Sequence, residues 1–129
     1  MKFAIALFGA PHTPASRRAL EFAKAALASG HEIVRLFLYQ DAVFTASSNL
    51  VVPQDEADNA SLWRAFISEH NLDAVVCIAA ALRRGTLDET EAKRYDKGAS
   101  VSAPWELSGL GQLHEAAQMA DRLICFGER

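Results

Sequence analysis

The sequence lacks long hydrophobic runs and a strong charge of either sign. Its apolar stretches are interrupted by charged residues well short of the roughly 20 residues that a membrane-spanning helix needs. The 13 Lys and Arg residues stand against 16 Asp and Glu residues, a formal charge of −3 over 129 residues. So mild and acidic a balance does not indicate a nucleic-acid-binding surface. We therefore expect neither direct nucleic-acid binding nor insertion into a membrane.

Cysteine is scarce. The two cysteines, Cys77 and Cys125, lie far apart in apolar, strand-like segments. A disulfide framework is therefore not expected, and a reducing compartment is favoured. Residues 1–10 superficially resemble a signal peptide, but the apolar run stops at Pro11 and suits a buried strand better. These observations predict a cytoplasmic protein.

Patterns that hold metals or nucleotides are missing as well. The four histidines and two cysteines show no paired ligand spacing such as C-x2-C or H-x3-H. Residues 9–12 after the first apolar run contain no G-x-G-x-x-G and no Walker lysine. We expect neither a metal nor a cofactor. The acidic group Asp88, Glu89 and Glu91 favours helix capping over a carboxylate dyad.

The residues that are present suit one α/β domain over residues 1–129. Half of them are hydrophobic, 22% are charged, and no linker-like stretch divides the chain. Apolar segments predict strands at 2–8, 31–39, 72–78 and 122–126. Helical spacing predicts helices over 14–30, 56–70, 79–85 and 112–119, and residues 86–89 resemble a capping box that opens a further one.

This alternation predicts the fold class. Strands that alternate with helices indicate an open, mostly parallel sheet of about five strands with helices on both faces. In such a fold, ligands and chemistry gather outside the carboxyl ends of the strands. The residues that follow each predicted strand are therefore the candidates for function.

Cys77 is the strongest of these candidates. It ends a predicted strand and precedes the short predicted helix at 79–85. Helix N-terminal N–H groups, together with the nearby Arg83 and Arg84, would favour the thiolate, which is the nucleophilic form. A free cysteine is also a common small core residue, so the local pattern alone leaves both interpretations open. Cys125, inside the last apolar segment, is expected in the core.

Four weaker candidates complete the survey. His12 follows the first predicted strand as either an exposed loop residue, an acid/base group or a partner contact, and residues 41–53 form a long, partly ordered connection. Trp63 and Trp105 suit the core or an interface. Cys77 and Arg83 match the Cys-x5-Arg spacing of phosphatases and rhodaneses, but residues 78–82 favour a helix and lack the glycine that such a loop needs.

The segment that begins at Cys77 resembles a known family. Residues 77–85 (CIAAALRRG) and 88–92 (DETEA) closely resemble the corresponding segment of the TusD/DsrE family, the DsrE-type subunits of bacterial sulfur relays. Residues 22–32, 37–43, and 107–111 with 115–116 resemble further parts of the same family. The resemblance covers nearly the whole chain. It implies a DsrE/DsrF-like sandwich and a sulfurtransferase that carries persulfide sulfur on Cys77 without a cofactor.

The resemblance also implies partners. Sulfur would arrive from a TusA-like carrier, leave to a TusE-like acceptor, and end in 2-thiouridine of tRNA. TusB- and TusC-like subunits would complete a heterohexamer, or the chain would form a homo-oligomer. The alternative is a non-catalytic interaction subunit of a sulfur-relay or sulfur-oxidation complex, in which Cys77 is only a core residue.

Overall fold

A five-stranded parallel sheet organises the chain. The computed structural model describes residues 1–127. The strands lie in the order β4-β3-β2-β1-β5, and each neighbouring pair is parallel. Their bounds are β1 (Lys2–Leu7), β2 (Glu32–Leu38), β3 (Ala74–Cys77), β4 (Glu106–Ser108) and β5 (Arg122–Phe126). The predicted fold class is confirmed, and the sheet is parallel throughout.

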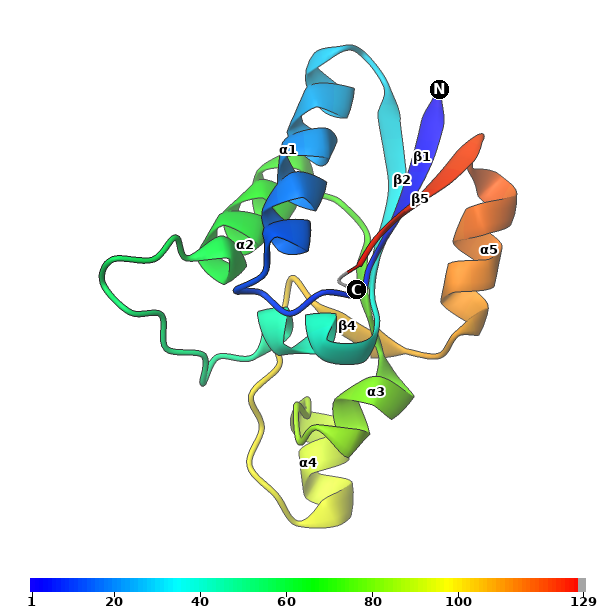
Figure 1. Ribbon diagram of the computed structural model, residues 1–129. Coiled ribbons are helices and arrows are strands. Elements are labelled where there is room, and N and C mark those ends of the chain that lie inside the picture. The colour runs from blue at the N-terminus through cyan, green and yellow to red at the C-terminus, as the bar shows by residue number, and fades with distance from the viewer. Residues whose placement is uncertain (128–129) are drawn as a thin grey trace.

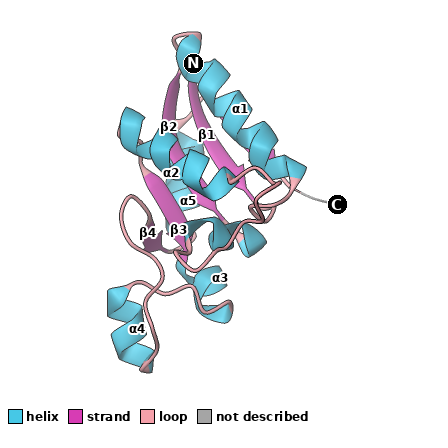
Figure 2. Cartoon of the chain, turned by 90° about the vertical axis from the view of Figure 1, so that its left-hand side faces the viewer, coloured by secondary structure: helices cyan, strands magenta, loops and turns pink. Residues whose placement is uncertain are grey.

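Helices cover both faces of this sheet. Figure 1 shows α1 (Pro14–Ala28) and α2 (Asn59–His70) on one face and α5 (Gly111–Met119) on the other. The 3₁₀ helix η1 (Gln40–Ala46) follows β2. The two remaining helices, α3 (Ile78–Arg83) and α4 (Glu89–Tyr95), lie beyond the carboxyl ends of the strands in both Figure 1 and Figure 2. The carboxyl end of the sheet therefore carries an additional layer of structure.

Local signals determine where α1 begins and ends. Thr13 occupies the N-cap position with an extended backbone, and Pro14 follows in the first turn, where its missing N–H leaves no hydrogen bond unmade. Gly30 lies just beyond the helix with φ +85°, a conformation that glycine adopts without steric cost. The helix predicted from residue 14 to Gly30 is confirmed. The predicted helix over 56–70 is shorter at its start, because Asp58 caps α2.

The start of α4 corrects a prediction. Asp88, and not Thr86, is the N-cap residue, because its carboxylate accepts a hydrogen bond from the Glu91 N–H at 2.8 Å. Thr86 is buried, and its hydroxyl donates to the Ala81 carbonyl at 3.2 Å, where it closes the end of α3. The capping box predicted at residues 86–89 is therefore displaced by two residues, while the capping role of the acidic group is confirmed for Asp88.

The strand β4 is the element that the sequence does not predict. It has three residues, Glu106–Ser108, and pairs with β3 so that Ser108 lies opposite Cys77. A glutamate and a serine interrupt any apolar run, so periodicity gives no strand signal here. The neighbouring strand supplies the pairing partner, and tertiary context determines the conformation.

The central strands and both tryptophans form the core. Residues 4–7 of β1 and 36–38 of β2 are at most 1% exposed. Trp63 is fully buried, and its indole N–H donates to the Ser16 hydroxyl at 3.2 Å. Trp105 is buried as well. The core interpretation of both tryptophans is confirmed.

Arg35 carries a charge into this interior. Its side chain on β2 is 10% exposed, and the guanidinium reaches Asp73 Oδ2 at 2.9 Å and Glu115 Oε1 at 3.4 Å. It also donates to the Gln112 carbonyl at 2.8 Å. A buried charge is tolerated when it is paired and hydrogen-bonded in this way. The cluster joins β2 to α5 and to the residue that precedes β3.

Candidate active site around Cys77

Cys77 lies at the junction of β3 and α3. It is the last residue of the strand and the residue immediately before the helix begins at Ile78. The valines that precede it favour a strand, and the alanines that follow favour a helix, so the local sequence itself favours a strand-to-helix transition at Cys77. The cysteine thus occupies the carboxyl end of a parallel strand, the position at which open α/β sheets place functional groups.

The thiol of Cys77 is covered. The residue is 1% exposed, although Ile78 is half-buried and Ala79 is exposed. Its register partner on β4, Ser108, is half-buried. Cys77 therefore lies directly beneath the surface. A reactant can reach its sulfur only through a local opening of the structure.

The two arginines lie at the opposite end of α3. Arg84 Nε contacts Asp41 Oδ1 at 2.9 Å, and Nη1 donates to the Ala80 carbonyl at 3.1 Å. Arg84 therefore ties α3 to η1, and Asp41 balances its charge. Arg83 is exposed and makes no ion pair among residues 1–127. The positive charge expected near Cys77 is thus separated from it by the length of α3.

The Cys-x5-Arg interpretation fails on geometry. Phosphatases and rhodaneses with this spacing wrap a loop of backbone N–H groups around an oxyanion. In this chain, residues 78–83 form a regular helix, α3. The first four N–H groups of a helix have no internal partner, but they point along the helix axis and do not curl around a bound ion as the N–H groups of such a loop do. The segment therefore offers no oxyanion-binding loop.

Cys125 corrects another prediction. It was expected in the core, but it is exposed on β5. The reason is that β5 lies at the edge of the sheet and pairs only with β1. An apolar run in a parallel sheet is covered on both faces only where helices extend over it. The sequence shows the run and not its place at the edge.

His12 and residues 41–53 lie together at the carboxyl end. His12 lines a hollow of about 250 Å³ with Leu50, Pro53 and neighbouring residues. The first half of the connection is η1, and its residues Ala42, Val43 and Ala46 are fully buried. The first part of the connection, residues 40–46, is therefore ordered and packed into the core.

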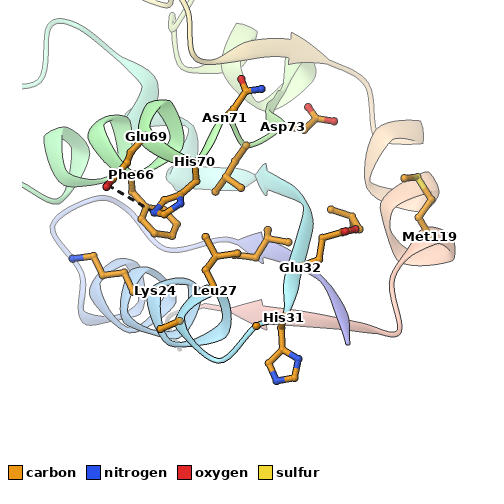
Figure 3. Close-up of a pocket in the computed structure, with 15 residues that line it drawn as sticks. Lys24, Leu27, His31, Glu32, Phe66, Glu69, His70, Asn71, Asp73 and Met119 are labelled. Carbon is orange, nitrogen blue, oxygen red and sulfur yellow. Dashed lines mark ion pairs between the residues drawn. The ribbon is translucent and has the colours of Figure 1, made fainter.

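Two larger hollows flank opposite ends of the sheet. One, of about 910 Å³, lies beside the end of α3, where Arg83, Lys97 and Tyr95 are among its lining residues. The other, of about 1020 Å³, lies at the amino end of β2, between the last turns of α1 and α2. Figure 3 shows Lys24, Glu69 and His70 in this second hollow. The sequence predicts neither hollow, because each gathers residues from distant segments.

Metal sites and membrane spans are not found in the described chain. Among residues 1–127, no three His, Cys, Asp or Glu side chains come close enough to hold a metal ion. Over the same residues, no helix combines the length and the hydropathy that crossing a membrane requires.

Comparison with known proteins identifies the family. The sequence model of the DsrE/DsrF-like family matches residues 1–126. The chain is 68% identical to "Sulfurtransferase TusD homolog" of Pseudomonas aeruginosa, over 98% of both chains. It is 41% identical to sulfurtransferase TusD of an Enterobacter species, over 98% of this chain and all of that one. The ychN protein from E. coli shares the fold, with a TM-score of 0.76, 22% identity and 98% and 99% coverage.

The chain is a sulfurtransferase of the open, parallel α/β class. It belongs to the DsrE/DsrF-like family, and among the relatives compared it is similar to TusD-type members along their full length. The resemblance drawn from the Cys77 segment is confirmed, and so is the predicted transferase activity.

Proposed function

We propose that Cys77 is the residue that carries sulfur, as a persulfide, between two partner proteins. The observation that carries this proposal is the position of Cys77 at the carboxyl end of β3, immediately before α3, in a chain of a sulfurtransferase family. The other cysteine, Cys125, lies on the edge strand, and within residues 1–127 no helix follows it.

The chemistry needs no oxidant or reductant. The Cys77 thiolate attacks the outer sulfur of a donor persulfide, which forms the new S–S bond on Cys77 and breaks the S–S bond of the donor. The donor leaves as a thiolate. In the second half, a thiolate of the acceptor attacks the outer sulfur on Cys77, and Cys77 leaves as a thiolate again. Sulfur moves twice, and the oxidation level of the protein is unchanged over the cycle.

The partners in this proposal are those that the resemblance to the TusD/DsrE family implies. They are a TusA-like donor, a TusE-like acceptor and a destination in 2-thiouridine of tRNA, and the relatives support them only through their name, sulfurtransferase TusD. TusB- and TusC-like subunits in a heterohexamer, or further copies of this chain, would complete the assembly. We place the relay in the cytoplasm, where the free thiols of Cys77 and Cys125 stay reduced. Residues 1–129 act in it as one DsrE-like unit.

The arginines take different supporting roles in this proposal. Arg84 holds α3 against η1 through Asp41, so it positions the helix that follows Cys77. Arg83 is exposed and is available to a partner protein. Neither arginine needs to touch the sulfur.

The test is intact-protein mass spectrometry after incubation with a cysteine desulfurase, cysteine and a TusA-type carrier. Wild type and the matched control Cys125→Ser should gain the mass of one sulfur atom, and a reductant should remove it. Cys77→Ser should gain nothing while its circular dichroism stays native. An adduct on Cys77→Ser would overturn the assignment of Cys77. If no variant gains sulfur even with a competent donor, the chain is a non-catalytic subunit.

A further inference from the structure

The hollow at the end of α3 has an unusual charge. Two cationic residues, Arg83 and Lys97, are among the residues that line it, and no Asp or Glu does. The whole chain is acidic, with a formal charge of −3. Neither cation makes an ion pair among residues 1–127. The hollow is therefore a local positive site on an acidic protein, and a negatively charged ligand complements it.

The rest of the lining suits a polypeptide. Leu82 is half-buried, Leu87 is buried, and Tyr95 is an exposed aromatic side chain at 49%. Apolar and aromatic lining beside a few charged groups is typical of surfaces that bind a protein segment. The hollow of about 910 Å³ has room for several side chains.

The hollow also lies close to the proposed sulfur carrier. Cys77 precedes α3, and Arg83 is the last of the six residues of that helix. At 1.5 Å per residue, the helix separates the two by about 9 Å. An extended peptide covers that distance with about three residues. Once a local opening exposes the Cys77 thiol, a segment held in the hollow can therefore present a neighbouring residue to it.

We propose that this hollow docks an acidic segment of the protein that exchanges sulfur with Cys77, at about three residues from that protein's own reactive cysteine. The inference rests on the proposed function and names the chemistry of its partner. Arg83 and Lys97 bind the carboxylates of the segment, and Tyr95 packs on its apolar groups. The opposite hollow carries both signs of charge, including Lys24, Glu69 and Asp73, and has no such preference.

Binding is tested without sulfur chemistry. The probe is a fluorescein-labelled peptide with three glutamates, one leucine and no cysteine, titrated by anisotropy onto the Cys77→Ser chain. We expect saturable binding that Arg83→Ala with Lys97→Ala weakens by about tenfold or more, since two charged contacts are lost. Lys93→Ala is the matched control, because Lys93 is an exposed cation on α4 outside the hollow. Equal binding by both variants, or no binding, overturns the proposal.

Two further arms separate the alternatives. A single-stranded RNA oligonucleotide that binds with the same dependence on Arg83 and Lys97 would show that the hollow takes phosphates, and would overturn the proposal. On persulfide-loaded wild type, peptides with a cysteine three residues from the glutamates should accept sulfur faster than peptides with a spacing of eight. Equal rates overturn the inferred spacing. The peptide-binding measurement uses Cys77→Ser, so its outcome does not depend on whether Cys77 carries sulfur.

Discussion

The two ends of the sheet are built differently. At the amino end, the hollow between α1 and α2 is lined by side chains of both charges, and His70 Nε2 lies 3.7 Å from Glu69 Oε2 within it (Figure 3). At the carboxyl end, α3 and α4 form an extra layer, and the buried Cys77 lies beneath it. The charged residues among 1–127 that line the adjoining hollow, Arg83 and Lys97, are both cations. The larger hollow is thus not the one nearest the candidate chemistry.

This difference shows that the volume of a hollow does not indicate where the candidate chemistry lies. A parallel sheet directs every strand toward the same end, so the residues after the strands meet there and the residues before them meet at the other. Volume at the amino end arises because α1 and α2 finish there and leave a gap. At the carboxyl end, Cys77 is itself part of the packed core, whereas the cations Arg83 and Lys97 line the hollow without an ion pair among residues 1–127.

The largest effect should come from a sulfur-transfer assay that compares a variant at the carboxyl end of the sheet with a variant at the amino end. Cys77→Ser should lose all sulfur acceptance, since no other thiol takes its place. Lys24→Ala with Glu69→Ala, at the amino end, should transfer at the wild-type rate. The measurement is single-turnover transfer of radiolabelled sulfur. A folded amino-end variant that loses transfer would break the comparison and move the site.

The second effect concerns the two cysteines of the chain. Cys125 is exposed and Cys77 is 1% exposed, so a small alkylating reagent reaches Cys77 only through local opening. We expect Cys77 to react about a hundredfold more slowly than Cys125 in the free chain, as a local opening of about 3 kcal/mol would give. The measurement uses the single-cysteine variants Cys125→Ser and Cys77→Ser. In denaturant the two rates should become equal; a fast native Cys77 would contradict its burial.

The third effect concerns the free energy of unfolding and the buried cation Arg35. Arg35→Ala should lower the free energy of unfolding by about 2 kcal/mol, because it removes a mostly buried guanidinium from its contacts with Asp73, Gln112 and Glu115. Both carboxylates are partly exposed and can be solvated, which limits the loss. Urea unfolding measures it. The control Arg17→Ala breaks an exposed pair with Glu21 and should change little.

The smallest effect, again on the free energy of unfolding, is expected at the carboxyl end of the sheet. Asp41→Asn removes the ion pair with Arg84, whose partners are 61% and 25% exposed. Pairs this exposed contribute less than about 1 kcal/mol. Urea unfolding at low and at high salt checks the value, which should shrink as salt screens the wild-type pair. A loss several times larger would mean that the contact between η1 and α3 carries the stability of this end.

Local signals in the sequence predict most of the fold. The apolar runs at residues 2–8 and 31–39 become β1 and β2, because burial on both faces requires such runs. Thr13 and Pro14 start α1 where capping preferences place a start. The same kind of signal places Cys77 at a strand-to-helix junction, and the family resemblance of residues 77–92 is the ground for proposing that it carries sulfur.

What the sequence does not predict depends on contacts between distant segments. β4 forms because β3 offers it an edge, and Cys125 is exposed because β5 lies at the other edge. The pair Asp41–Arg84 and the hollow that holds Lys97 bring together residues far apart in the chain. Single-sequence patterns report what each segment prefers and not which segment lies beside it.

The position of β1 between β2 and β5 has a consequence for the order of folding. β1 pairs on one side with β2 and on the other with β5, from Phe3 opposite Arg122 to Leu7 opposite Phe126. The Asp121 N–H also donates to the Lys2 carbonyl at 2.7 Å. Contacts this distant in sequence form late and slow folding. On the ribosome, β1 therefore keeps one edge unpaired until the residues of β5 emerge.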